Sequence, residues 1–446
     1  METLILSLSK DEDFGSCARS GMGWAMTDRL PPQPWITAAP TRAVVEALEA
    51  AGGAGCARFV GGCVRDALLR RPVEDVDIAT PLTPPEVIRA LETAGLKAVP
   101  TGIEHGTVTA VAHGKPFEVT TLRRDVETDG RRAVVAFTRD WTEDAQRRDF
   151  RLNALYAEPD GTLYDPTGGG LADAAARRVV FVGDAETRIR EDYLRILRFF
   201  RFNAQFGAQF ARGEPDAVGL RACADLREGL RTLSAERVSK ELLKLLGAED
   251  PRATVRIMAA IGVLGELLPE AGPLARYEGL VEIESAQLFE NDAELRLAAL
   301  LPDDRAVVAA ACARLRLSNA QRARLTAAVS VDEAPIVSWM SPREVRRAVY
   351  AIGAQAFRDR VKLAWAASTR PATTPQWRML YVYPTTWTPP VFPLTGAQIK
   401  AAGAPEGPLV GAVRREVERW WVDLDFPDDP LATVERLKAV VQGMTY

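Results

Sequence analysis

The sequence predicts an α/β head with a mixed sheet and flanking helices, followed by an all-α remainder. Between residues 36 and 165, short runs of β-branched residues alternate with helical apolar spacing and are separated by Gly-containing turns. From about residue 185 onward, long amphipathic helical patterns follow one another, as in AETRIREDYLRILRFFRFNAQF and SAERVSKELLKLLG. The chain has 446 residues, too many for one ordinary hydrophobic core, so we expect several domains.

The elements of the head follow from local patterns. Residues 41–51 have the apolar spacing of a helix, and GGAGCARFVGG then predicts a turn, a short strand and a second turn. VRDALLRR predicts a helix and VDIAT a strand. The clearest β-hairpin is GTVTAVAHGKPFEVTTLR, residues 106–123, because β-branched residues alternate on both sides of a His-Gly-Lys-Pro turn. AVVAFT and LNALYAEPDGTLYDP predict further strands.

Beyond the head, DPRATVRIMAAIGVLGELL predicts another long helix, and helical patterns continue along the rest of the chain. Residues 369–396 are the exception, since their Pro and Trp content predicts a linker or an irregular wrap. Residues 1–35 begin with a short apolar run that has no basic flank before it and no cleavage site after it. We therefore expect a disordered extension or an overlong start there, with Met22 or Met26 as the alternative start, rather than a signal peptide.

Composition excludes several classes of protein. The chain lacks an uncharged apolar run of about eighteen residues, so we expect no membrane span. Five cysteines without a CxxC pair indicate reduced thiols in a cytoplasm, with neither a disulfide framework nor a zinc site. The two histidines, His105 and His113, are too few for a histidine-based metal centre or hydrolase, so the chemistry should rest on carboxylates. Although the net charge is -4, arginine clusters such as 188–202 are compatible with a polyanionic partner.

The first candidate site is the turn in RFVGGCVRDALLRR. Gly61 and Gly62 allow a ligand to approach the backbone, and the N–H groups that open the following helix would form an anion site. Arg65 lies in the first turn of that helix, within reach of phosphate oxygens. An ordinary strand-to-helix turn explains the same residues, and the turn alone leaves both interpretations open.

Three carboxylates form the second candidate site. Asp75 and Asp77 are two residues apart in the expected strand, so their side chains should share a face. Such close carboxylates repel each other unless a divalent cation neutralises them, and a metal pair roughly 3.5–4 Å apart is the usual device for in-line displacement at phosphorus. An acidic edge strand is the alternative. Glu118 in FEVTT becomes a third carboxylate if its strand pairs beside VDIAT, and otherwise points to solvent.

Charged residues at two later positions could bind a nucleotide. Arg147, Arg148 and Asp149 stand just ahead of an expected strand, where the arginines could clamp a triphosphate or form a solvated turn.

On the next expected helix, Glu191 and Arg195 are four apart, which by default is a surface ion pair worth roughly 0.3–0.5 kcal/mol. Asp192 and Arg195 are three apart and share a face, so that together they offer an acceptor and donors for a nucleobase edge. Helical spacing alone does not decide between these interpretations.

Taken together, these stretches resemble the class II nucleotidyltransferase family, which contains bacterial CCA-adding enzymes (tRNA nucleotidyltransferases) and bacterial poly(A) polymerases. The signatures, in order, are GGCVRD with DVD, HGTVT, FEVTTLR, EDAQRRDFRLNAL, DPTGGGLAD, REDYLRILRFFRF and LSAERVSKELLKLL. They cover residues 56–246, and FPLTGAQIKAAGAPEGPLVG at 392–411 is a weaker match.

The resemblance implies a role for each candidate residue. The phosphates would be held by Gly61, Gly62 and Arg65, and two Mg²⁺ ions by Asp75 and Asp77, with Glu118 as a further active-site carboxylate. Ribose and phosphate contacts match Arg148, Asp149 and Asn153. The pair that recognises the incoming base matches Asp192 and Arg195, with Glu191 orienting Arg195 and with Arg198 near the nucleotide.

The resemblance also implies the activity and the domain plan. A tRNA 3′-hydroxyl would attack the α-phosphorus of CTP or ATP, pyrophosphate would leave, and the cycle would build the terminal CCA without a nucleic-acid template. The expected domains are a catalytic head at 36–165, a base-recognising neck at 166–250, a body at 251–345 and a tRNA-binding tail at 346–446. Segment 123–140 matches the family's flexible loop, which is said to aid the switch from C to A. Neither DNA nor a membrane is an expected partner, and the oligomeric state stays open.

Other functions remain to be weighed. A poly(A) polymerase of the same family is the closest, but those relatives tend to have a strongly basic tail, whereas residues 416–436 are acidic. A partial CC-adding or A-adding enzyme and a catalytically silent RNA-binding protein are the others. The chain departs from the family at Arg151, where Thr is frequent, and at Tyr193, where Pro or Ala is common. With two histidines it cannot have the HD phosphohydrolase domain of some relatives.

Overall fold

A computed structural model describes residues 28–128, 133–207, 216–329, 335–368 and 371–443. Residues 1–27 of the expected N-terminal extension lie outside these residues. The expected disorder is wrong for residues 28–35, because the Leu30 N–H donates to the Gly161 carbonyl at 2.8 Å and the Leu30 side chain is buried in the core of the head. The chain divides into two compact units, which meet in sequence between Pro269 and Glu270. The finer domain boundaries at 165, 250 and 345 stay predictions. Within the described residues, every helix is too short or too polar to cross a membrane.

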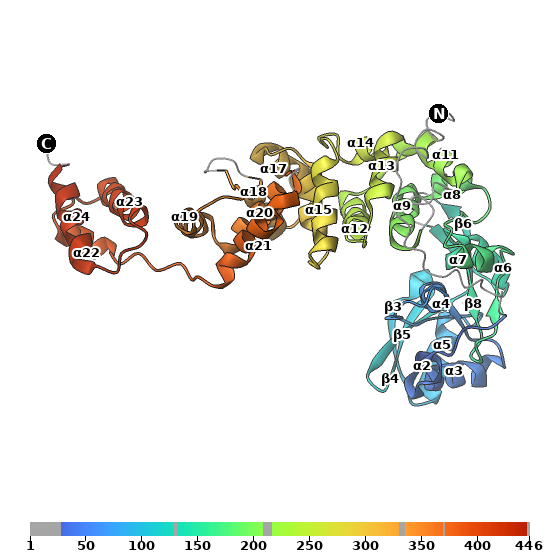
Figure 1. Ribbon diagram of the computed structural model, residues 1–446. Helices are drawn as coiled ribbons and strands as arrows, with labels where there is room; N and C mark the ends of the chain where they lie inside the picture. Colours follow the sequence, from blue (N-terminus) through green and yellow to red (C-terminus); the bar gives the residue numbers. More distant parts are fainter. Residues whose placement is uncertain (1–27, 129–132, 208–215, 330–334, 369–370, 444–446) are drawn as a thin grey trace. The chain divides into compact units, whose positions relative to one another are not determined.

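The head of the first unit is built on one mixed seven-stranded sheet, which confirms the expected α/β class (Figure 1). The strand order is β3-β4-β5-β2-β1-β8-β9, and β2 runs parallel to β5 while the other neighbours are antiparallel. The strands are β1 (Arg58–Val60), β2 (Asp77–Thr80), β3 (Lys97–Gly102), β4 (Thr107–Ala112), β5 (Lys115–Thr121), β8 (Tyr156–Ala157) and β9 (Leu163–Tyr164).

One face of this sheet is covered by helices. Apolar residues of α3 (Ala39–Gly52) and α5 (Pro84–Thr93), such as Val44, Leu48, Val87 and Leu91, pack in one core with Val108 and other inward residues of the strands. The short helices α2 (Pro34–Thr37) and α4 (Gly62–Leu68) and the 3₁₀ turn η1 (Ile103–His105) complete this part of the head. Burying these aliphatic side chains supplies the main driving force for folding the head.

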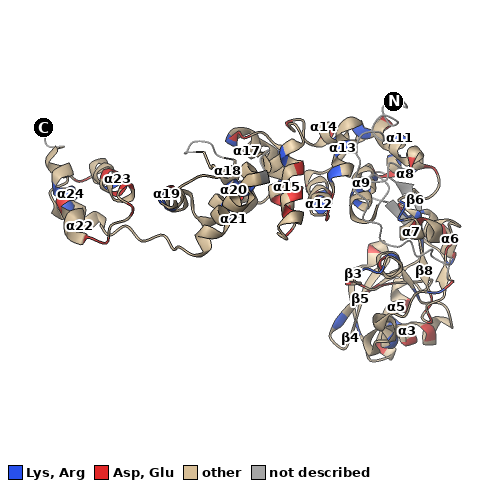
Figure 2. Cartoon of the chain, in the orientation of Figure 1, with Lys and Arg blue, Asp and Glu red and all other residues tan. Residues whose placement is uncertain are grey.

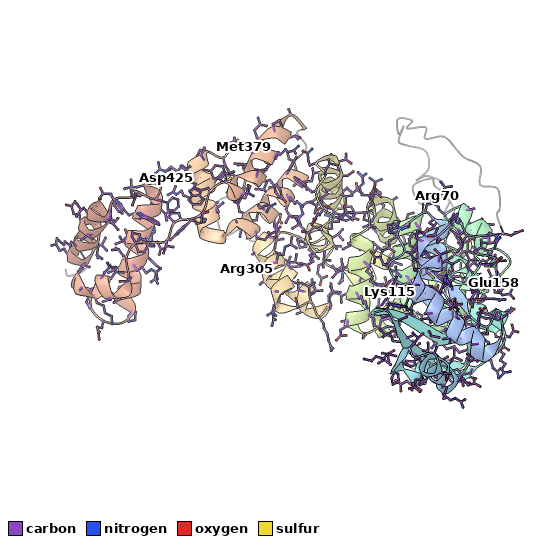
Figure 3. All side chains as sticks on the ribbon, turned by 90° about the horizontal axis from the view of Figure 1, so that it is seen from below. Arg70, Lys115, Glu158, Arg305, Met379 and Asp425 are labelled. Atoms are coloured by element: carbon purple, nitrogen blue, oxygen red, sulfur yellow. The ribbon has the colours of Figure 1, made fainter. Side chains whose placement is uncertain are left out.

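The β4–β5 hairpin is confirmed, with a tighter turn than the sequence predicts. His113 (φ 50°) and Gly114 (φ 78°) are the only loop residues, and both have the left-handed conformation that a two-residue hairpin favours. Lys115 and Pro116 therefore belong to β5. Figure 3 labels Lys115 at the point where β5 begins. Segment 123–140 contributes β6 (Arg123–Thr128) and β7 (Ala133–Phe137), which form their own two-stranded sheet.

Helices make up the rest of the first unit. They are α6 (Trp141–Gln146), η2 (Arg151–Asn153), α7 (Gly170–Ala175), α8 (Ala185–Glu191), α9 (Leu194–Phe206), α11 (Ala217–Asp225), η3 (Arg227–Thr232), α12 (Ala235–Leu246), α13 (Arg252–Ala260) and α14 (Val263–Leu267).

Two of the expected long helices are broken. The pattern over 185–206 predicts one helix, but the structure has α8 and α9 with Asp192 between them in an extended conformation (φ -156°, ψ 105°). The Asp192 carboxylate accepts a hydrogen bond from the Leu194 N–H at 3.1 Å, which competes with helical backbone bonding. The second break falls at Gly262, whose φ of 82° separates α13 from α14. The strand expected after Asp149 is likewise replaced by η2 and the two-residue β8.

The second unit is helical, as expected. Its elements are α15 (Ala275–Ala286), α16 (Ala293–Leu300), α17 (Arg305–Arg314), α18 (Asn319–Ala328), α19 (Pro342–Ile352), α20 (Ala354–Ala366), η4 (Pro371–Thr373), α21 (Thr374–Val382), η5 (Tyr383–Thr385), α22 (Gly396–Ala401), α23 (Pro408–Asp423) and α24 (Pro430–Gly443). Much of segment 369–396 is thus helical, with Met379 of α21 labelled in Figure 3, and only its later part fits a linker. An ion pair between Glu284 and Arg296, both fully buried, joins α15 to α16 at 2.7 Å.

Candidate active site

A cavity of about 380 Å³ within the first unit collects most of the candidate residues. A volume of this size suits one small ligand. Six arginines and three aspartates are among its lining residues, which are Gly61, Gly62, Arg65, Asp77, Arg147, Arg148, Asp149, Asn153, Asp192, Leu194, Arg195, Arg198, Phe202 and Arg237. Asp75, Glu118 and Glu191 do not line it. Figure 2 shows that basic and acidic residues are intermixed along both units. The cavity differs in that six arginines are among its lining residues.

The Gly61–Gly62 turn lies at the wall of the cavity. Gly61 has φ 71° and ψ -117°, a conformation that a residue with a side chain rarely adopts. A Cβ atom there would come within 3.5 Å of the Arg148 guanidinium. Helix α4, which follows, has seven residues, so its dipole is a minor source of positive potential. The sequence suggested that the N–H groups at the start of α4 would bind an anion. In the structure, the arginines that line the cavity are the stronger anion-binding groups.

Two of the three candidate carboxylates, Asp77 and Glu118, are neighbours on two parallel strands. Asp77 begins β2 and is the register partner of Glu118 in β5, so the pairing on which the role of Glu118 depended is confirmed. The expectation that one strand contains both Asp75 and Asp77 is wrong, whereas the expectation that their side chains share a face stays a prediction. Because β2 begins at Asp77, Asp75 precedes the ladder and lies exposed in irregular chain.

The electrostatics of Asp77 fit a cation site. Burial, together with repulsion from Glu118 and to a lesser extent from Asp75, raises the pKa of Asp77 to about 6 against the opposing effect of Arg148. A divalent cation would relieve this repulsion. Among the described residues, however, three or more metal-binding side chains do not converge on one point. The described side chains therefore place negative charge around Asp77 but do not form a complete set of metal ligands.

Asp144 is a functional candidate that the sequence did not single out. It is 1% exposed and lies at the centre of a cluster of donors. Arg147 contacts one carboxylate oxygen at 2.7 Å, Arg148 contacts the other at 2.9 Å, and the Tyr156 hydroxyl donates to it at 2.6 Å. Burial disfavours the charged form, but Arg148 and Arg147 hold the pKa of Asp144 below its usual range. The spacing of Asp144 to Arg147 and Arg148, three and four residues, was the available signal.

Asp149 and Asn153 connect two further arginines at the opposite wall. Asp149 accepts hydrogen bonds from the Arg198 Nε at 2.7 Å and from the Asn153 amide at 3.0 Å. The Asn153 carbonyl oxygen in turn accepts from Arg65 at 2.7 Å. Burial opposes ionisation of Asp149, and Arg198 together with Asn153 outweighs it and lowers the pKa. This chain of contacts fixes the directions of Arg65 and Arg198 before a ligand arrives.

The break between α8 and α9 places Asp192 and Arg195 in the cavity. Arg195 donates to the Glu191 carboxylate at 2.6 Å and to the backbone oxygens of Arg188 and Arg147 at 3.0 and 3.1 Å. The i,i+4 pair of Glu191 and Arg195 is therefore present, although it spans a break instead of lying along one helix. Glu191 acts from outside the lining by holding the guanidinium of Arg195.

Asp192 is held from two sides. One carboxylate oxygen accepts from the Leu194 N–H at 3.1 Å, and the other is bound by Arg237 at 2.7 Å. Arg237 belongs to α12, inside the LSAERVSKELLKLL signature, but its side chain was not among the expected site residues. Phe202, which the sequence did not single out, lines the cavity and lies under Arg65, Arg198 and Arg201 at 4.0 to 5.3 Å from the ring centroid. Helical periodicity does not distinguish a Phe that lines a cavity from a Phe of the core.

Two family models match the chain. Residues 57–180 match the "Poly A polymerase head domain", and residues 218–273 match the "Probable RNA and SrmB- binding site of polymerase A".

Curated relatives resemble about half of the chain. A mitochondrial CCA tRNA nucleotidyltransferase 1 from Danio rerio is 46% identical over 224 residues, which are 50% of this chain and 49% of that protein. A CCA-adding enzyme from Leuconostoc citreum is 44% identical over 217 residues, or 48% of this chain and 50% of that protein. The chain thus spans about half the length of these curated relatives.

Solved structures match a larger share of this chain than the curated relatives do. The crystal structure of the Bacillus stearothermophilus CCA-adding enzyme in complex with CTP covers 92% of this chain and 98% of its own, with a TM-score of 0.70 and 26% identity. The Thermotoga maritima CCA-adding enzyme complexed with tRNA covers 87% and 91%, with a TM-score of 0.60 and 20% identity, a likeness of fold alone. The expected architecture of a mixed-sheet head and a helical remainder is confirmed.

Proposed function

We propose that this chain is a nucleotidyltransferase of the family that the poly(A) polymerase head domain defines. It adds CMP and AMP from CTP and ATP to the 3′ end of tRNA and so builds the terminal CCA. The observation that carries the proposal is that one cavity is lined by Asp77, by Asp192 and by six arginines, of which Arg195 is one. Each of these groups matches one part of a nucleoside triphosphate.

The transfer itself exchanges one phosphoester bond for another. The 3′-hydroxyl of tRNA attacks the α-phosphorus, the bond to the β-phosphate oxygen breaks, pyrophosphate leaves and the hydroxyl proton is released. Arg65, Arg148 and Arg198 would bind the phosphates, with Asp149 and Asn153 at the ribose. Asp75 and Asp77 would hold two Mg²⁺ ions, which when bound stabilise the developing charge, and Glu118 would add negative charge beside them. The chain's own contribution is positioning and electrostatics.

Base selection would rest on Asp192 and Arg195. Cytosine and adenine both carry an exocyclic amino group, which donates, beside a ring nitrogen that accepts a hydrogen bond. A carboxylate accepts from the first and a guanidinium donates to the second, whereas uracil and guanine present a carbonyl oxygen at the corresponding place. The Asp192 oxygens, although engaged by Leu194 and Arg237, keep further lone pairs for this contact.

The direct test uses three tRNAs, ending before CCA, after the first C and after CC. Each is incubated with Mg²⁺ and labelled CTP or ATP separately. Addition of C, then C, then a single A supports the proposal. Long A tails would instead identify a poly(A) polymerase, addition of C alone or A alone would identify a partial enzyme, and failure to add any nucleotide would contradict an enzymatic role. A cytoplasmic location stays a prediction.

Asp192→Ala should reduce selectivity more than rate. Without the carboxylate, the amino group of the base loses its acceptor, so the preference for CTP over UTP should fall about 10- to 100-fold. The measurement is kcat/KM for each of the four nucleotides on the same tRNA. Asp225→Ala, which removes an exposed carboxylate at the end of α11, is the matched control. Unchanged selectivity in Asp192→Ala would count against the base-recognising role.

A further inference from the structure

The aromatic ring of Tyr193 lies at the break between α8 and α9, next to the Asp192 carboxylate in sequence. Asp192 is extended, whereas Tyr193 already has helical angles (φ -60°, ψ -17°) and precedes the first residue of α9. The change of direction that brings Asp192 into the cavity therefore occurs across this one peptide. A residue that holds Tyr193 in place therefore also restrains the backbone of Asp192, from which the Asp192 side chain extends.

Gly229, in η3, is the residue against which the Tyr193 ring packs. A Cβ atom built at Gly229 would lie 2.0 Å from Cδ1, 2.1 Å from Cε1 and 2.5 Å from Cγ of the ring. Gly229 is not among the glycines with positive φ, so its backbone would accept a side chain and the ring alone forbids one. Because Cγ is among the three atoms, rotation of the ring about its own axis cannot remove the clash. The ring or its backbone would have to move.

η3 is anchored and cannot easily retreat from the ring. Arg231 forms two hydrogen bonds with Glu266 of α14, at 2.7 and 3.0 Å, and the buried Leu230 fixes the same turn in the core. The Gly229 backbone also accepts from the Thr232 hydroxyl at 2.8 Å and donates to Leu226 at 3.1 Å. Any added volume at position 229 is therefore transmitted to Tyr193.

We propose that Tyr193 and Gly229 are a positioning pair that sets the nucleotide selectivity of this chain by fixing the backbone of Asp192. The proposal rests on the proposed function, because it assigns the base contact to Asp192. Gly229 touches neither the cavity nor the nucleotide in this scheme; it acts through the ring. The three restraints on Asp192 are then the Leu194 N–H, the Arg237 guanidinium and the packed ring of its neighbour.

The test compares Gly229→Ala, Tyr193→Ala and the double variant. Gly229→Ala should lower the preference for CTP over UTP about tenfold or more, because a displacement of about 1 Å at a positioning group costs up to about 100-fold. Tyr193→Ala should lower it only about threefold, since two restraints remain. In the double variant the clash is gone, so its selectivity should return to within about threefold of Tyr193→Ala.

Each substitution has a control variant: one adds the same methyl group elsewhere, and the other changes Tyr193 without removing its ring. Gly265→Ala adds the same methyl group in α14, where the surroundings are open, and should leave selectivity unchanged. Tyr193→Phe keeps the ring and removes only the hydroxyl, and should also resemble the wild type. The readouts are kcat and KM for CTP and UTP on one tRNA, and equilibrium binding of both nucleotides without tRNA. A purely structural role would lower the thermal stability of Gly229→Ala without changing the ratio of the two dissociation constants.

The outcomes separate this inference from the proposed function. Wild-type selectivity in Gly229→Ala would overturn the inference, as would a selectivity loss that Tyr193→Ala fails to relieve in the double variant. If Gly229→Ala does not fold, the inference requires that the double variant folds and matches Tyr193→Ala; a double variant that also fails to fold overturns it. A wild type that binds CTP over UTP but transfers no nucleotide would refute the proposed function alone, because the binding ratios still decide the inference.

Discussion

Asp77→Asn is expected to lower nucleotide incorporation about 10³-fold or more, for CTP and ATP alike, while tRNA binding survives. Several kcal/mol of charge stabilisation at the α-phosphorus depend on a metal ligand at this position, and each 1.4 kcal/mol corresponds to about a factor of ten. Asn preserves the size of the side chain and removes its charge, so the fold should persist. Single-turnover incorporation with excess enzyme measures the effect on the chemical step.

The controls for Asp77→Asn test the charge itself. Glu92→Gln removes one exposed carboxylate from α5 in the same head and should leave the rate unchanged. Chelation of Mg²⁺ in the wild type should reproduce the loss that Asp77→Asn causes. If the variant keeps more than about a tenth of the wild-type rate, the assignment of Asp77 as a metal ligand is refuted.

Asp144→Asn is expected to lower the free energy of unfolding of the first unit by about 3 kcal/mol, the lower end for a broken buried ion pair, because Arg147 and Arg148 keep some contact with water. Both guanidiniums would lose the carboxylate that fixes them at the cavity wall. We therefore expect the KM for CTP and ATP to rise about tenfold, with a smaller change in kcat. Denaturant unfolding and steady-state kinetics measure the two effects.

The pH dependence of this variant follows from the direction of the shift. Burial disfavours the charged form of Asp144, but Arg148 and Arg147 lower its pKa in the folded state. The ion pairs therefore add stability above the pH at which an unfolded aspartate titrates, about pH 4, and that stability is lost as the pH falls further. The difference in unfolding free energy between wild type and Asp144→Asn should be constant between pH 6 and 8 and should shrink below about pH 4. A difference that stays constant down to pH 2 would contradict the assignment.

Local patterns predicted the parts of the fold whose geometry depends on nearby residues. The β4–β5 hairpin followed from alternation around His113 and Gly114, and the helical second unit followed from apolar spacing. The pairing of Asp77 with Glu118 could only be stated as a condition, because the two residues are 41 apart and meet through a parallel ladder. For the site, the sequence named eleven of the fourteen lining residues in advance, all except Leu194, Phe202 and Arg237.

The remaining features depend on contacts that periodicity does not describe. The helix break at Asp192 comes from one carboxylate capping the next helix, while the apolar residues on both sides keep a continuous helical pattern. Arg237 was missed because its partner, Asp192, is 45 residues away and only the folded chain brings the two near. Asp144 lies four residues before Arg148, so its spacing was a signal, but its burial shows only in the folded chain. Asp75 was expected in the strand but precedes it, because the ladder between β2 and β5 starts only at the pair of Asp77 and Glu118.

The arginines of the cavity are already compensated by protein carboxylates. The pairs are Arg65 with Asp66, Arg147 and Arg148 with Asp144, Arg195 with Glu191, Arg198 with Asp149 and Arg237 with Asp192. Such a cavity holds few solution counterions, so a nucleotide that enters it releases few. Its binding should consequently weaken much less with added salt than six uncompensated arginines would imply, whereas RNA on an open basic surface would show the full counterion effect. Titrating the protein with CTP and with tRNA at 50 and 200 mM salt would show whether nucleotide binding depends less on salt than tRNA binding does.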